Sequence, residues 1–146
     1  MENYANQPET YIALLDIDNF DHLNRAYGET FGDNMNKLTA EALRSYFPKP
    51  KELCLARIGG KEFAVLFQAN DANDAKLQLD ECRIGVAEKA IVTPDISLSL
   101  GVSVGFSQIE GEPDTALALA EQAKLIAQQL GKNRVKGHIR AVAKAS

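Results

Sequence analysis

The 146-residue sequence lacks any hydrophobic run long enough to cross a bilayer, because charged residues interrupt every apolar stretch well short of about 20 residues. Its first ten residues are polar and include Glu2 and Glu9, which is not the pattern of a secretory signal. Cysteine is scarce, and Cys54 and Cys82 have no metal-ligand spacing, so both are expected to be small buried apolar side chains. These absences favour a domain of the reducing cytoplasm that makes no contact with a membrane.

The last part of the chain lacks acidic residues. The net charge is −4, yet none of the 20 Asp and Glu lies between Gln122 and Ser146, where six of the 16 Lys and Arg are found. This stretch would suit a small anion such as a nucleotide phosphate, but on charge alone a solvated tail is the favoured interpretation. The acidic body of the chain, and strands without the paired stacking aromatics of an RNA-recognition sheet, predict no nucleic-acid partner.

Hydrophobic periodicity predicts a single α+β domain. Apolar runs and alternating patterns predict strands at residues 11–17, 53–58, 62–67 and 96–104, with a short last strand at 133–135. Helices are predicted between them, and the resulting order is that of a ferredoxin-like βαββαβ core with extra helices. We expect an N-terminal extension at 1–10, one domain at 11–138 and a C-terminal tail at 139–146.

Start and stop signals set the predicted boundaries. Gly28 is expected to stop the first helix, Asp33 to cap the second and Gly131 to follow the last. Gly59 and Gly60 predict a hairpin turn in which both residues take positive φ. Pro48 and Pro50 are expected to end the second helix. The side chains expected to face the core along the four helices are Phe20, Leu23 and Tyr27; Met35, Leu38, Ala42, Leu43 and Tyr46; Ala75, Leu79, Cys82 and Val86; and Leu117, Ala120, Ala123 and Ala127.

Two acidic residues mark the end of the first strand. Asp16 and Asp18, with the backbone carbonyl of Ile17 between them, offer the hard oxygen ligands that Mg²⁺ accepts beside nucleotide phosphates. A strand end that caps the following helix is the commoner role of an isolated motif of this kind. On its own, the motif therefore indicates a metal site only weakly.

Further motifs follow in a fixed order. A hairpin reads Gly59-Gly60-Lys61-Glu62-Phe63, and the other motifs are Leu15-Asp-Ile-Asp-Asn-Phe20, Leu23-Asn24, Tyr27-Gly28, Phe31-Gly-Asp33, Ser99-Leu-Gly-Val102 and Gly131-Lys-Asn-Arg-Val135. This ordered set, over residues 13–135, resembles the GGDEF family of bacterial diguanylate cyclase domains. The resemblance implies a nucleotide-cyclase-like fold, in which helices flank a central, mostly antiparallel sheet.

The resemblance also implies a homodimeric enzyme that joins two GTP molecules into cyclic di-GMP, with Mg²⁺ or Mn²⁺ as the cofactor. Asp16 and the carbonyl of Ile17 would hold the metal, and Asp18 would do so more weakly. Asn24 and Asp33 would bind guanine, which suits an amide that both donates and accepts and a carboxylate that accepts. Without a nucleotide, Asn24 would be an ordinary surface residue of a helix and Asp33 the N-cap of the second helix.

The signature hairpin contributes Gly59 and Gly60 to nucleotide binding and Glu62 to catalysis by the same resemblance. Lys132 would keep a cation where the family has a phosphate-binding Arg, without its bidentate fork. The third signature position is an acid in active members, where it ligates metal, but it is Lys61 here. An ammonium cannot ligate Mg²⁺, and it places positive charge where a cation must bind.

Other positions also depart from the family. Asp21 stands where the family often has a phosphate-contacting Lys, and Gln128 where the last helix usually supplies another. The RxxD motif of product inhibition is replaced by Pro50-Lys-Glu-Leu53. The family's usual N-terminal helix is missing before the first strand, so either it lies outside this sequence or this edge of the domain packs differently.

The sequence therefore predicts a degenerate, catalytically inactive GGDEF domain of cyclic di-GMP signalling. Its role would be regulatory, through a bound guanine nucleotide or through docking in a homodimer or against a neighbouring signalling domain. Lys61 would either reach Asp16 as a built-in cation or point to solvent from the hairpin. The alternatives are an active homodimeric diguanylate cyclase that uses Asp16, Asp18 and Glu62 for metal, and a purely structural dimerisation domain.

Overall fold

The computed structural model describes residues 8–47, 52–89, 91–92 and 97–138. None of the helices in these ranges is long and apolar enough to cross a bilayer. The elements, in chain order, are β1 (Glu9–Ile17), α1 (Phe20–Tyr27), α2 (Glu29–Tyr46), β2 (Glu52–Arg57), β3 (Glu62–Ala69), α3 (Ala72–Glu88), β4 (Ile91–Val92), β5 (Ser97–Leu98), β6 (Val102–Gln108), α4 (Pro113–Gln129) and β7 (Arg134–Gly137).

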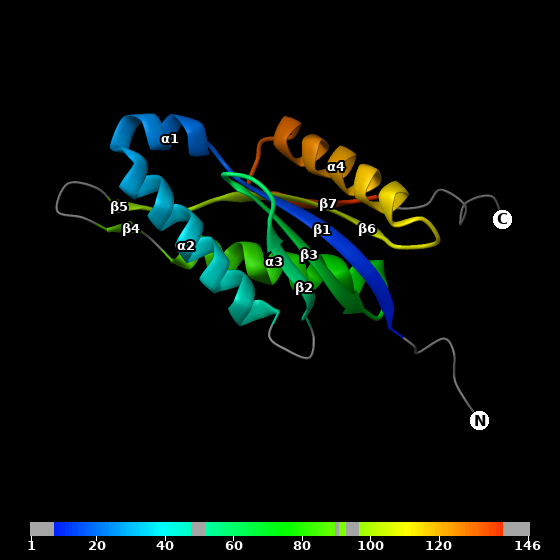
Figure 1. Cartoon of the computed structure of the whole chain (residues 1–146). Coiled ribbons are helices and arrows are strands. Elements are labelled where there is room, and N and C mark those ends of the chain that lie inside the picture. Colours follow the sequence, from blue (N-terminus) through cyan, green and yellow to red (C-terminus); the bar gives the residue numbers. More distant parts are fainter. Residues whose placement is uncertain (1–7, 48–51, 90, 93–96, 139–146) are drawn as a thin grey trace, which may run out of the picture.

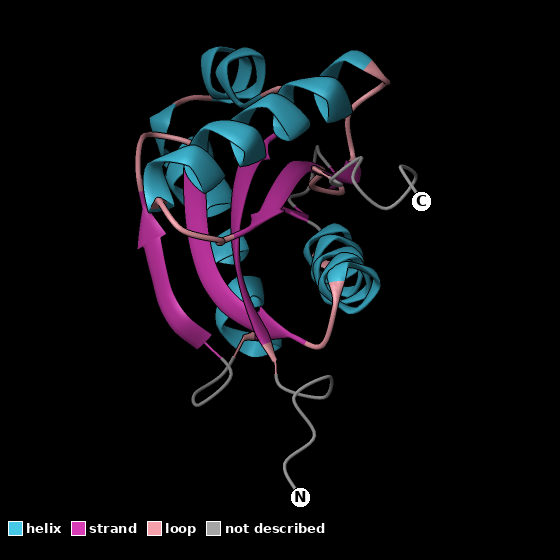
Figure 2. Ribbon diagram, turned by 90° about the vertical axis from the view of Figure 1, so that its right-hand side faces the viewer, coloured by secondary structure: helices cyan, strands magenta, loops and turns pink. Residues whose placement is uncertain are grey.

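Five strands form one sheet in the order β2-β3-β1-β6-β7, and β4 pairs with β5 separately. The central strand β1 is antiparallel to β3 and β6, β2 is antiparallel to β3, and only β7 is parallel to its neighbour β6. Helices α2 and α3 cover one face of the sheet, and α4 covers the other (Figures 1 and 2). The predicted α+β fold, a mostly antiparallel sheet flanked by helices, is confirmed.

The main core lies between the sheet and the pair α2 and α3. Every second residue of β1 from Tyr11 to Ile17 faces it, because side chains alternate between the two faces of a strand. The predicted residues of α3 all lie in this core, and burial raises the pKa of the Cys82 thiol to about 12, which makes it unreactive. The side chain of Cys54 lies outside the described part of the chain.

Helix α4 packs closely against the opposite face because small residues meet there. Its buried side includes Ala116, Ala120, Ala123 and Ala127. Gly105 of β6 faces this helix, and a Cβ on Gly105 would overlap the backbone of Ala120 and Lys124. The prediction that Leu117 belongs to the buried side is wrong, since 40% of it is exposed and Ala116 is buried instead. Such a close contact has room for alanine but not for leucine, and Lys124, four residues after Ala120, is buried on the same side.

Two predicted boundaries near the first helices and the hairpin are corrected. Asp33 does not cap α2, because the helix already begins at Glu29, and Gly28 with φ of 96° both ends α1 and precedes α2. The hairpin between β2 and β3 is confirmed, but neither Gly59 nor Gly60 has positive φ. Instead, the side chain of Arg57 donates to the carbonyl oxygens of both glycines at 3.1 Å and holds the turn.

The predicted strand at 96–104 is divided in the structure. β5 ends at Leu98 and β6 begins at Val102, because the intervening chain turns toward β1. The carbonyl oxygen of Gly101 accepts a hydrogen bond from the backbone N–H of Asp18 at 2.9 Å. The short last strand runs over 134–137 rather than 133–135, and Gly131, with φ of 129°, follows α4 as predicted.

Some predictions fall on residues that the structure does not describe. Pro48, Pro50 and the predicted tail at 139–146 lie outside the described ranges. The described chain begins at residue 8, and β1 starts at Glu9, inside the predicted N-terminal extension.

The contact between Gly105 and α4 gives a stability prediction. Gly105→Ala should lower the free energy of unfolding by about 1–3 kcal/mol, because the new methyl group would push α4 away from the sheet. Gly60→Ala is the control, since a Cβ there would meet nothing within 4 Å. Urea unfolding of both variants measures the difference. Equal stability of the two variants would contradict the tight contact.

Candidate functional site

Part of the predicted site, namely Asp16, Ile17, Asp18, Lys61 and Lys132, lies together where the central strand β1 ends. A polar pocket of about 290 Å³ is lined there by Asp16, Ile17, Asp18, Asn19, Phe20, Asp21, His22, Arg25, Lys61, Gln128 and Lys132. These residues come from the β1–α1 connection, the β2–β3 hairpin and the end of α4. The sheet order places β1 between β3 and β6, so segments far apart in the sequence meet at one end of the sheet.

Both carboxylate oxygens of Asp18 accept hydrogen bonds from the protein. Its Oδ1 accepts a hydrogen bond from the Ser103 hydroxyl at 2.6 Å, and its Oδ2 accepts one from the backbone N–H of Asn133 at 2.8 Å. Burial raises the pKa of the Asp18 carboxyl above its ordinary value, although these two hydrogen bonds and the Lys132 ammonium act in the opposite direction. Asp18 therefore ties β1 to β6 and to the turn before β7, and it does not cap α1.

Asp16 lies beside a second carboxylate. It is paired with Glu62 across β1 and β3, so the two side chains project from the same face of the sheet, the one that α4 covers. Oδ2 of Asp16 accepts a hydrogen bond from the Gln128 amide at 3.1 Å and lies 3.5 Å from the ammonium of Lys124. Oδ1 of Asp16 is buried and has no hydrogen-bond partner.

Lys124 supplies the positive charge at this point. Its side chain is only 4% exposed, and its ammonium pairs with Asp16, with Glu62 and, at 3.2 Å, with Glu121 one helical turn earlier. Burial alone would lower the pKa of the Lys124 ammonium, but the carboxylates of Glu62, Asp16 and Glu121 raise it above its ordinary value. The ammonium is therefore charged at neutral pH.

Lys61 pairs with a different acid. Its ammonium contacts Asp21 on α1 at 3.2 Å, and the two side chains are 40% and 69% exposed. The backbone carbonyl of Lys61 accepts a hydrogen bond from the N–H of Ile17 at 3.1 Å, which fixes the hairpin against the end of β1. Within the described residues, the ammonium beside Asp16 is that of Lys124, whereas Lys61 occupies the rim of the pocket.

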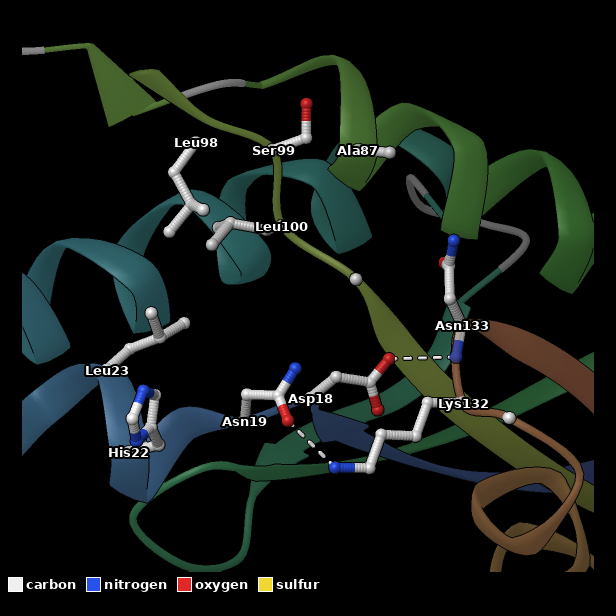
Figure 3. A pocket seen from close by; sticks show the side chains of 12 residues that line it. Asp18, Asn19, His22, Leu23, Ala87, Leu98, Ser99, Leu100, Lys132 and Asn133 are labelled. Carbon is white, nitrogen blue, oxygen red and sulfur yellow. Dashed lines mark hydrogen bonds between the residues drawn. The ribbon is translucent and has the colours of Figure 1, made fainter. Parts of the chain in front are cut away.

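Lys132 and Asn19 approach the pocket from opposite sides. The Lys132 ammonium donates to Oδ1 of Asn19 at 2.8 Å (Figure 3). Lys132, Asn133 and Asn19 all have positive φ, with values of 65°, 47° and 59°. Such backbone conformations are uncommon outside glycine, and they place the side chains of Lys132 and Asn19 at the mouth of the pocket.

Asn24 lies on α1 and Asp33 on α2, and these two helices pack against one another. The Asn24 side chain packs directly on Gly32, where a Cβ would overlap its amide oxygen, and Asp33 is the next residue along α2. Asp33 is exposed and Asn24 is half-buried. The pocket around Asp16 and Lys61 is not lined by either residue, so the structure separates them from the cluster at the end of β1.

A second pocket of about 390 Å³ adjoins the first. It lies between α1, the end of α3 and the connection before β6, and its lining residues are Asp18, Asn19, His22, Leu23, Ala87, Leu98, Ser99, Leu100, Gly101, Gly131, Lys132 and Asn133 (Figure 3). Asp18, Asn19, His22 and Lys132 line both pockets. Leucine side chains make the second pocket the more apolar of the two.

The donor set does not fit a divalent cation as it stands. Both oxygens of Asp18 accept hydrogen bonds from the protein, and one oxygen of Asp16 faces Lys124 and Gln128. The remaining oxygen of Asp16 is buried below the surface. In the described residues, no three Asp, Glu, His or Cys side chains are arranged so that they could hold a metal ion. Mg²⁺ needs accessible oxygen ligands, so these carboxylates would have to be released first.

Two residues that determine this arrangement, Lys124 and Ser103, are not predicted from the sequence. Lys124 belongs there only to a basic stretch, and Ser103 is one polar residue of an alternating strand. A signal for Lys124 does exist, since it continues the four-residue spacing of Ala116 and Ala120 on the buried side of α4. The pairing of Ser103 with Asp18 joins residues 85 positions apart, which no local pattern reveals.

Comparison with known proteins places the chain among cyclase domains. Residues 1–134 match the family described as "Diguanylate cyclase, GGDEF domain". Diguanylate cyclase A of Treponema denticola is 29% identical over 127 residues, which cover 85% of this chain and 34% of that protein. A second relative, diguanylate cyclase DgcP of Pseudomonas aeruginosa, is 30% identical over 126 residues, which cover 85% of this chain and 18% of that protein. This chain therefore spans about a third or less of the length of these relatives.

Two solved structures are similar over most of the chain. The GGDEF domain of DgcB from Caulobacter crescentus, in complex with c-di-GMP, has a TM-score of 0.81 and 28% identity, covering 89% of this chain and 78% of that one. The diguanylate cyclase SiaD from Pseudomonas aeruginosa, in complex with its activator SiaC, has a TM-score of 0.81 and 28% identity, covering 89% of this chain and 50% of that one.

The hydrogen bond from Ser103 to Asp18 gives a prediction that depends on pH. Ser103→Ala should destabilise the domain by about 1–3 kcal/mol at neutral pH, because it removes a donor from a buried carboxylate. The loss of stability should be smaller in mild acid. Because the pKa of Asp18 is raised in the folded protein, Asp18 takes up a proton at a higher pH there than in the unfolded chain, and a neutral carboxyl gains less from the Ser103 hydrogen bond than a carboxylate does.

Urea unfolding at the two pH values measures this effect. Ser107→Ala is the matched control in the same strand, because the Ser107 hydroxyl bonds only the neighbouring carbonyl of Gln108, at 3.3 Å. A loss for Ser103→Ala that is the same at both pH values would argue against a charged partner.

Proposed function

This chain belongs to the GGDEF family, and we propose that it is a member that has lost cyclase activity and acts as a regulatory module in cyclic di-GMP signalling. The match over residues 1–134 shows that the chain belongs to the family, and the similarity to the DgcB domain supports its fold. The proposal concerns what this particular site does within that family.

The observation that carries the proposal is the charge around Asp16. GGDEF cyclases use divalent metal ions, and Asp16 is the residue expected to hold one. Here its neighbours Lys124 and Gln128 engage one carboxylate oxygen, and Lys61 stands at the hairpin position where active members have an acid. An ammonium beside the expected metal ligand repels a divalent cation, and losing a metal ligand typically costs several orders of magnitude in rate.

Guanine nucleotide binding is the regulatory role that the remaining residues favour. The Asn24 side chain packs on Gly32, Asp33 is the next residue along α2, and Asp33 is exposed. Lys132, Arg25 and Lys61 bring positive charge to the neighbouring pocket, where phosphates would lie. Docking to a second copy or to a signalling partner is the other form that regulation could take, and the structure of SiaD with its activator SiaC is a precedent for a partner protein in a related cyclase.

An active cyclase is the second candidate. It is favoured by the relatives, which are named diguanylate cyclases, and by the presence of Asp16, Glu62, Asn24 and Asp33. Such an enzyme would require Lys124 to release Asp16 and Glu62 when GTP and metal arrive.

A product assay separates these candidates. The wild-type domain at high concentration, incubated with GTP and Mg²⁺ or Mn²⁺, should yield no cyclic di-GMP by mass spectrometry, because Asp16 is already paired. Lys61→Glu should also yield none, since Lys124 and Gln128 still engage Asp16. The GGDEF domain of an active cyclase, assayed in parallel, shows that the conditions permit the reaction. Product from the wild type would overturn the proposal.

Calorimetric titration tests the regulatory role. GTP and GDP should bind more tightly than ATP, and Asn24→Ala or Asp33→Ala should weaken GTP about tenfold or more, because each loses a hydrogen bond to guanine. Asn34→Ala is the control, since Asn34 is an exposed neighbour on the same helix. If no guanine nucleotide binds, the docking role is the one that survives.

A further inference from the structure

Lys124 is an unusual residue for its position. The side of α4 that faces the sheet is otherwise made of alanines, and Gly105 allows the helix backbone to touch β6 at Lys124 itself. Lysine is almost never buried unless its charge is paired, and here the residue is 3% exposed. A small apolar residue would satisfy the packing, so the packing alone does not explain a buried ammonium.

The ammonium is placed at a point of concentrated negative charge. Asp16 and Glu62 occupy directly paired positions on β1 and β3, and like charges in such positions repel one another. Lys124 contacts both carboxylates, and Glu121 completes the set from the surface side, where it is 44% exposed. One buried cation therefore holds the two carboxylates together.

We propose that Lys124 is the resident cation of the Asp16–Glu62 carboxylate pair and takes the place of a divalent metal ion in this domain. The domain then folds, and presents its pocket to ligands, without Mg²⁺. The inference rests on the same site as the proposed function, but it is tested without nucleotide. The charge of Lys61 is secondary in this arrangement, because that ammonium is exposed and paired with Asp21.

Mn²⁺ binding, followed by electron paramagnetic resonance in the absence of nucleotide, tests the proposal. The wild type should bind no Mn²⁺ at this site, so wild type and Asp16→Asn should give the same titration. Lys124→Met, which keeps an unbranched side chain of similar length, should gain an Mn²⁺ site. The Lys124→Met, Asp16→Asn double variant should lose that site again. Lys76→Met is the matched control, because Lys76 is an exposed lysine on α3 and its loss changes the net charge equally.

Thermal unfolding gives a second readout. Mn²⁺ should raise the melting temperature of Lys124→Met progressively with its concentration and leave that of the wild type unchanged, because only a ligand of the folded state stabilises it. If Lys124→Met does not fold in metal-free buffer, the double variant Lys124→Met, Glu121→Gln is measured in the same way. The second substitution removes the charge of Glu121, which would otherwise have lost its lysine partner.

Two results would overturn the proposal. One is that the wild type binds Mn²⁺ and the Asp16→Asn variant does not, a result that requires no lysine variant. The other is a folded Lys124→Met protein that gains no Mn²⁺ site dependent on Asp16. Neither result depends on whether the wild type makes cyclic di-GMP, so failure of this inference is distinguishable from failure of the proposed function.

Discussion

The end of the central strand depends on how two adjacent carboxylates are neutralised. Asp16 and Glu62 lie opposite one another on β1 and β3, beneath a helix that excludes most of the water. Without a cation, their repulsion would act in a medium of lower dielectric constant than water and would oppose the pairing of the two strands. Removing one partner of a buried ion pair typically costs about 3–5 kcal/mol, and less here because the Glu62 side chain is 25% exposed. Lys124 therefore supports both the sheet and the position of α4.

Asp16 and Asp18 have different partners because the strand ends between them. Asp16 still belongs to β1 and projects toward α4, whereas Asp18 lies beyond the strand and turns to Ser103 and the backbone of Asn133. Asp18 consequently acts as a connector between segments, and its hydrogen bonds compensate much of the cost of burying its charge. The motif thus contains one structural acid, Asp18, and one acid with a cation beside it, Asp16.

Much of the fold was predictable because its elements are strongly periodic. The predicted core residues of α3 are all buried, and the run from Tyr11 to Ile17 is the central strand. The predicted start of the second helix was wrong, because α2 begins at Glu29, directly after Gly28, and Asp33 lies within the helix.

The sequence predicted that Asp16, Asp18, Lys61 and Lys132 belong to one site, and all four line one pocket, but it did not predict which charges pair there. Hydrophobicity assigned Leu117 to the buried side of α4, whereas the close contact of this helix with β6 at Gly105 favours the smaller Ala116 there, and Lys124 is buried on the same side. Helical spacing places Lys124 on the buried side with Ala116 and Ala120, but its carboxylate partners on β1 and β3 are distant in the sequence, so no local pattern shows that it pairs with them.

The two lysines near Asp16 differ in how firmly they are held. Lys61 and Asp21 form an exposed pair of a kind that contributes about 0–1 kcal/mol, so Lys61 can leave its partner at little cost. Lys124 has no such freedom, because its side chain is only 4% exposed and its ammonium is paired with carboxylates. A cation that approached Asp16 would therefore meet the buried ammonium even if the hairpin moved aside. The charge beside Asp16 is then determined by Lys124 of α4 more than by Lys61 of the signature hairpin. A helix face can in this way change the chemistry of a site whose recognisable motif lies elsewhere in the sequence.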